Sequence, residues 1–121
     1  GAGAIPADMA FVAPANIKLL SAWRLNQSAS DVTAGTAVSS ASYRRMTLLN
    51  AGTGGAGTTI MASLNATASA ASLTTRAFVT TANNTATQGA LLLASHLTVG
   101  AATADGTDLA AGIVFLAYEL L

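Results

Sequence analysis

The sequence predicts an all-β protein, a jelly-roll-like β-sandwich of about eight short antiparallel strands. Two observations predict this fold. Apolar and polar residues alternate over short stretches, which is the period of a strand with one buried face. These stretches recur at intervals of about 10–15 residues and are separated by turns rich in Gly, Asn and Asp, a spacing typical of sandwiches and jelly rolls.

The strand predicted over residues 17–25 shows the clearest alternation. Its polar face carries the two cations Lys18 and Arg24, although Leu20 interrupts that face and indicates that it too is covered. Its apolar face consists of Ile17, Leu19, Trp23 and Leu25. Because one face of such a strand lies against the core, we expect these four side chains, Trp23 included, to be buried.

The remaining strands are predicted from shorter patterns. They cover residues 9–12, 43–50, 58–64, 76–81, 91–93 with 96–99, and 112–121. Met46 and Leu48 are expected on the inner face of one strand, and Ile60 and Leu64 on that of the next. Residues 82–89 are expected to form a polar turn built on two asparagines.

Length and composition predict one sandwich domain, residues 9–121, preceded by a flexible N-terminal arm, residues 1–8. Charged residues make up 8% of the chain and the formal net charge is zero. We therefore expect no nucleic-acid partner and no membrane partner, because both need a cluster of basic residues. A surface so poor in charge is expected to be covered by other subunits.

The segment Gly52–Thr59 satisfies the dinucleotide pattern G-x-G-x-x-G, but the sequence around it does not support a nucleotide site. No acidic residue lies between Asp31 and Asp105, where a ribose ligand is needed, and Thr58 stands where a P-loop has its lysine. We interpret the segment as a flexible turn. A nucleotide-binding α/β domain is the alternative that this turn leaves open.

No catalytic, metal or cofactor site is predicted, and we expect the protein not to be an enzyme. Ser95, His96 and Asp105 or Asp108 could formally make a triad, but no nucleophile elbow surrounds Ser95 and neighbouring strand residues face opposite ways. The segment Asp105–Asp108 has no closing glutamate for calcium, so it is interpreted as a hairpin turn.

The last predicted strand is apolar on both faces and is therefore expected to be covered on both. If Ile113 and Phe115 pack the sandwich, the opposite row needs another cover. That row, Val114, Leu116, Tyr118 and Leu120, is the hypothetical subunit interface. Arg44 and Arg45 are added to it as partners for carboxylates of a neighbouring subunit. A loop of the same chain is the alternative cover.

This order of strands and turns resembles small jelly-roll accessory proteins of tailed bacteriophages, which decorate or cement the capsid shell. The residues that carry the resemblance are 10–15, 16–23, 47–52, 60–65 and 109–119. The resemblance implies a non-enzymatic virion protein on the capsid surface, a homo-trimer bound to the major capsid protein.

The N-terminal arm is then expected to contact the capsid through Ile5, Pro6 and Asp8. Three alternative functions remain open from the sequence. They are the base of a head or tail fibre, a host-recognition module that binds carbohydrate, and the subunit of an extracellular filament.

Overall fold

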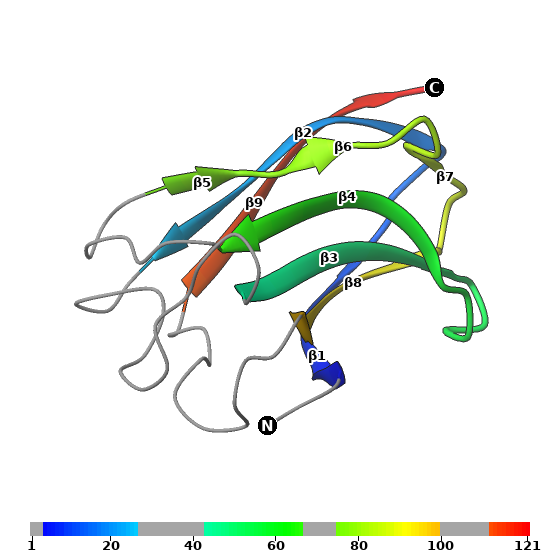
Figure 1. The fold of residues 1–121 in the computed structure, drawn as a ribbon. Coiled ribbons are helices and arrows are strands. Elements are labelled where there is room, and N and C mark those ends of the chain that lie inside the picture. The colour runs from blue at the N-terminus through cyan, green and yellow to red at the C-terminus, as the bar shows by residue number, and fades with distance from the viewer. Residues whose placement is uncertain (1–3, 27–42, 67–74, 100–111) are drawn as a thin grey trace.

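The computed structural model describes residues 4–26, 43–66, 75–99 and 112–121, which form antiparallel strands packed in two sheets (Figure 1). The strands are β1 (Ala4–Val12), β2 (Ile17–Asn26), β3 (Tyr43–Gly52), β4 (Thr59–Ala66), β5 (Thr75–Ala77), β6 (Val79–Thr80), β7 (Thr85–Ala86), β8 (Leu91–Val99) and β9 (Gly112–Leu120). The predicted all-β sandwich is confirmed. These residues contain no helix, and so none that could span a membrane.

The strands are not paired in the order of the chain. Sheet A has the order β1-β8-β3-β4-β6. In sheet B the long strand β2 lies in the centre, with β9 along one side and the short strands β5 and β7 along the other. Within the described part of the chain, β1 and β9 are thus the long edge strands of the two sheets.

One side of the sandwich is closed by the chain itself. The single strand expected over residues 76–81 is two strands, because β5 pairs with β2 in sheet B and β6 pairs with β4 in sheet A. Phe78, at the crossing, is buried and its backbone N–H donates to the carbonyl of Ala22 at 2.9 Å. Because the chain passes from sheet B to sheet A at Phe78, the prediction of one continuous strand over residues 76–81 is wrong.

The core lies between the sheets and is built from large and very small side chains. Its largest fully buried residues are Ile17, Leu19, Met46, Met61 and Leu92. Ala22, Ala62 and Ala94 are buried with them, and residues this small let the two sheets approach closely. Met46 and Leu48 are each 2% exposed, which confirms the inner face predicted for residues 43–50.

A β-bulge in β2 changes which of its side chains face the core. Leu19 lies opposite Tyr118 and Ser21 lies opposite Ala117, so Leu20 is an additional residue with no partner on β9. A one-residue insertion moves every later side chain to the other face. The expectation for Trp23 is therefore wrong, since it is 38% exposed, while Arg24 is only 3% exposed.

β4 has a similar irregularity. Leu48 lies opposite Ala62 and Leu49 opposite Ile60, so Met61 is the additional residue. Met61 and Ala62 are both fully buried, and Ile60 is displaced to the exposed side. The prediction that Ile60 and Leu64 share the inner face is correct for Leu64 alone.

The first strand is longer than the sequence predicts. It starts at Ala4 instead of Met9, and it pairs with β8 from Ala4, opposite Leu97, to Val12, opposite Leu91. The register shifts between Ile5 and Met9. Residues 4–8, expected as part of a flexible arm, are thus strand residues here, because β8 offers its whole length as a template.

Candidate functional site

The two faces of β9 are the reverse of those expected. Val114 and Leu116 pack against the core, whereas Ile113 and Phe115 are 39% and 46% exposed. The reason is the bulge in β2, because residues directly opposite in an antiparallel pair share a face. Leu116 lies opposite the buried Ala22, and Phe115 lies opposite the outward-facing Trp23.

The outer side of sheet B consequently carries a cluster of exposed large apolar side chains. We call it the apolar face, and it consists of Leu20, Trp23, Ile113 and Phe115. Leu25 lies opposite Ile113 and extends the row along the strands. Single exposed apolar residues are ordinary on a protein surface, but a contiguous patch marks a contact site.

None of the charged residues of β2 and β9 belongs to the apolar face. Arg24 is turned into the protein by the bulge. Lys18 and Glu119 lie opposite each other at the far end of the strands. The apolar face is thus bordered by one pair of opposite charges and contains none, which favours contact with another apolar surface over contact with water.

The outer side of sheet A combines a polar cluster with exposed apolar residues, among them Ile60 (41% exposed) and Val79 (71%). Arg45 donates from Nε to Oδ1 of Asn65 (3.1 Å) and from a terminal nitrogen to the Tyr43 hydroxyl (3.3 Å). The hydroxyls of Thr47 and Ser95 form a hydrogen bond of 3.1 Å on the neighbouring strands. The Arg45 partners observed are therefore neutral groups of its own chain, and this polar cluster has no counterpart among the residues of the apolar face.

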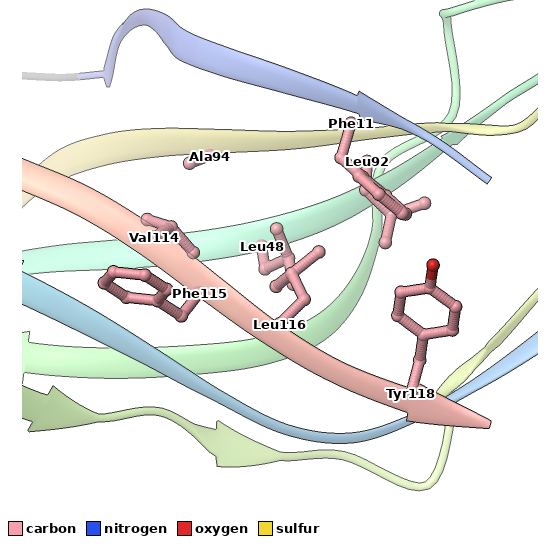
Figure 2. Close-up of a pocket in the computed structure, with 8 residues that line it drawn as sticks. All are labelled: Phe11, Leu48, Leu92, Ala94, Val114, Phe115, Leu116 and Tyr118. Atoms are coloured by element: carbon pink, nitrogen blue, oxygen red, sulfur yellow. The ribbon is translucent and has the colours of Figure 1, made fainter. Parts of the chain in front are cut away.

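An apolar cavity of about 300 Å³ opens between the two sheets on the side of β1 and β9. Its lining consists of Phe11, Leu48, Leu92, Ala94, Val114, Phe115, Leu116 and Tyr118 (Figure 2). The Tyr118 ring extends from β9 toward Phe11, and the two ring centroids are 5.6 Å apart. This contact bridges the two long edge strands, which no chain segment closes in the described residues.

The glycine-rich segment is the loop of a hairpin. It connects β3 to β4, which are antiparallel neighbours, and no helix begins after it. Pyrophosphate binding by a G-x-G-x-x-G turn requires the N-terminus of such a helix. The interpretation of residues 52–59 as a turn is confirmed, and the dinucleotide site is excluded by this geometry.

The residues of the formal triad are not brought together in what the structure describes. The Ser95 hydroxyl is bonded to Thr47. His96 is a strand residue opposite Met46, while Asp105 and Asp108 lie outside the described residues. Among the described residues, no three acidic or histidine side chains are grouped so as to hold a metal ion.

The residues predicted as a subunit interface are divided by the structure. Val114 and Leu116 pack inside their own chain, and Tyr118 and Leu120 are exposed along the edge of β9. The backbones of Arg44, Ile5, Pro6 and Asp8 lie in β3 and β1, but their side chains lie outside the described part of the molecule.

Trp23, Ile113 and Phe115 are the residues of the apolar face that were expected from the sequence to lie in the core. The sequence does contain a sign of the shift. Leu20 is a large apolar residue where the alternation requires a polar one, and it is the residue that bulges.

Comparison of the chain with protein-family models, with curated proteins and with solved structures finds no match.

Proposed function

We propose that the protein is a non-enzymatic structural component of a bacteriophage virion that decorates and stabilises the capsid shell as an oligomer. The observation that carries this proposal is the apolar face of sheet B. A chain with 8% charged residues that leaves Trp23, Phe115 and their neighbours exposed is suited to being covered by other subunits.

The difference between the two sides of the sandwich supports an orientation on the shell. The apolar face is directed to the capsid surface, where burial of its side chains stabilises the contact. The polar cluster on the outer side of sheet A, with Arg45, Asn65 and Thr47, is then directed to water. The mechanism is mechanical, since each small contact bridges neighbouring capsid subunits and several contacts per oligomer add up.

The number of subunits stays a prediction. In the trimer that the resemblance implies, Val114, Leu116, Tyr118 and Leu120 were the candidates to meet at a shared axis. Two of these side chains, Val114 and Leu116, pack in their own core, so a threefold contact would have to use different residues.

The proposal is tested by sedimenting purified protein with capsid shells of the phage that carries its gene. We expect the wild type to pellet with shells and Leu20→Lys to remain in the supernatant, because a charge then lies on the apolar face. Thr47→Lys, a change in the polar cluster of sheet A, is the matched control and should pellet like wild type. Equal sedimentation of Leu20→Lys and wild type, or no binding of either, would contradict the proposal.

Carbohydrate recognition is a second candidate because Trp23 is exposed on the outer side of sheet B, as a sugar-stacking platform requires. Such a platform also needs polar groups beside the ring. The residues opposite Trp23 are Phe115 and Ala77, neither of which has a polar side chain. A glycan array decides between the two, since saccharide binding that is lost in Trp23→Ala would favour the host-recognition module.

A further inference from the structure

The free edge of β9 differs from every other sheet edge in the described residues. An unpaired strand edge is a template for another chain, and proteins protect edges by keeping them short or by adding proline, charges and bulges. β5, β6 and β7 are two or three residues long. β1 contains Pro6 and Asp8 and has an irregular register beyond Ile5.

β9 has none of these protections along most of its length. It spans Gly112–Leu120 without a proline, and its one charged residue, Glu119, is next to its end. Its pairing with β2 is regular from Gly112 to Ala117. A long, regular and apolar edge of this kind pairs readily with another strand.

We propose that β9 pairs with β9 of a second copy of this chain, antiparallel and across a twofold axis at Phe115. The identity of the partner strand follows from which strand edges are free. If two copies join through strand edges, the long unprotected edge on each copy is β9, so the contact uses the same surface twice. Such an isologous contact has twofold symmetry, and a twofold axis normal to the sheet places the two strands antiparallel.

The side chains of β9 favour the axis at Phe115. With this register Phe115 meets its own copy, Ile113 meets Ala117, and Val114 meets Leu116, so every one of these pairs is apolar. With the axis one residue later, Ile113 would instead lie opposite Glu119. In the proposed register the two Glu119 residues are about 27 Å apart at 3.4 Å per residue, so the like charges do not meet.

The area available predicts a weak dimer. In this register Leu120 lies beyond the paired residues and Tyr118 lies opposite Gly112, so the side-chain contact comes mainly from Ile113 and Phe115, which are 39% and 46% exposed. Because Ile113 and Phe115 stay on the outer surface of the joined sheet, the pairing covers only a fraction of their roughly 150–200 Å² each, far less than the about 800 Å² per partner of a standard interface. The backbone hydrogen bonds between the two β9 strands add to this, so we expect a dimer that dissociates on dilution.

The pairing doubles the apolar face without covering it. The two sheets B become one continuous sheet, and the rows of Trp23 and Phe115 from both copies lie side by side on its outer surface. The inference rests on the proposed function in one respect, because the β9 dimer would be the oligomer that binds the shell. It is tested on purified protein without shells, so the pairing and the shell binding can fail separately.

The experiment measures native mass by light scattering over a range of protein concentrations. We expect the wild-type mass to rise from monomer to dimer, and Phe115→Lys to weaken the dimer at least tenfold, because two lysines would meet at the axis. Val79→Lys places the same charge on the exposed short strand β6 and should behave like wild type. Circular dichroism establishes that each variant keeps its β-sheet signal.

Four outcomes would overturn the inference. They are a wild-type monomer at every concentration, a trimer, a mass that grows without limit as in a filament, and a dimer that Phe115→Lys does not weaken.

Discussion

Gly57 is the residue at which the backbone approaches itself most closely in the β3–β4 loop. Its N–H donates to the carbonyl of Ala51 at 2.8 Å. A Cβ atom at this position would lie 2.8 Å from the carbonyl oxygen of Asn50 and 3.0 Å from the carbonyl carbon of Ala51. The loop therefore requires glycine at position 57, because there is no room for a Cβ atom.

We expect Gly57→Ala to lower the free energy of unfolding by about 1–3 kcal/mol, because the backbone of residues 50 and 51 has to move. Gly54→Ala is the matched control in the same loop, since no atom lies within 4 Å of its added Cβ. That variant should be neutral or slightly stabilising. Urea denaturation of both variants measures the difference, and equal stability would contradict the close approach.

Asn84 provides the hydrogen bonds of a strand partner to Leu19, next to the bulge of β2. Its carbonyl accepts the Leu19 N–H (2.7 Å) and its Nδ2 donates to the Leu19 carbonyl (3.2 Å). The side chain thereby satisfies a backbone group of a fully buried residue.

Asn84→Ala should cost about 1–2 kcal/mol of stability, because the Leu19 carbonyl loses its donor. Asn83→Ala provides the comparison. The side chain of Asn83 is exposed, and the bond from its backbone N–H to Oγ1 of Thr81 survives the substitution. Thermal unfolding that ranks the two variants as equal would show that the Asn84 side chain does not support the bulge.

At the scale of the strands, alternation predicted where the strands lie better than which way their residues face. Residues 17–25, 43–50, 58–64 and 112–121 are all strand segments as predicted. The predicted faces of Trp23, Ile60 and Phe115 are wrong, because a bulge in β2 and another in β4 each insert one residue. The residues after a bulge alternate as regularly as those before it, so the only mark of the bulge in β2 is Leu20, an apolar residue at a position where the alternation requires a polar one.

The bulge in β2 makes a spectroscopic prediction, because Trp23 is the only tryptophan in the chain. Without the bulge the indole would be enclosed between the sheets. We expect acrylamide to quench its fluorescence readily in the free protein, as for a ring that is 38% exposed. Leu20→Gly, which keeps the bulged residue, is the control and should quench alike, and a fully shielded indole would contradict the assigned face.

Leu48 has an alanine on each side, Ala62 on β4 and Ala94 on β8. Ala94 lines the cavity beside β9, whereas Ala62 is fully buried between the sheets. Ala94→Leu should therefore stabilise the protein by about 0.5–2 kcal/mol, because it fills open space. Ala62→Leu should destabilise it by about 1–3 kcal/mol through overpacking. Urea denaturation tests the pair, and the opposite order would mean that the cavity is already filled.

For the molecule as a whole, the sequence predicted the β-sandwich and shows directly that few residues are charged, but it did not predict the order in which the strands pair. β1 lies beside β8 and β2 beside β9, and contacts over such separations leave no local pattern. Which strands become edges follows from that order. The free edge of β9 and the apolar face could consequently not be located from the sequence, although it predicted that the last strand is involved.

The fold supports a division of roles between the strand edges and the outer face in the proposed assembly. The segment from β5 to β7 closes one side of the sandwich, and the other side ends in two long edges. β1 is protected by its sequence and β9 is not. The proposed pairing through β9 leaves the apolar face available for the proposed shell contact, so the two contacts do not compete.

The most direct test of this account is to trap the twofold contact with a single introduced cysteine, since the chain has none. Residues opposite each other in antiparallel strands have Cα atoms about 4.5–5.5 Å apart, which suits a disulfide. We predict that Phe115→Cys forms a covalent dimer rapidly under mild oxidation, and that Val79→Cys, on the exposed strand β6, stays monomeric. Equal crosslinking of the two variants, or none of Phe115→Cys, would contradict the pairing of β9 with its own copy.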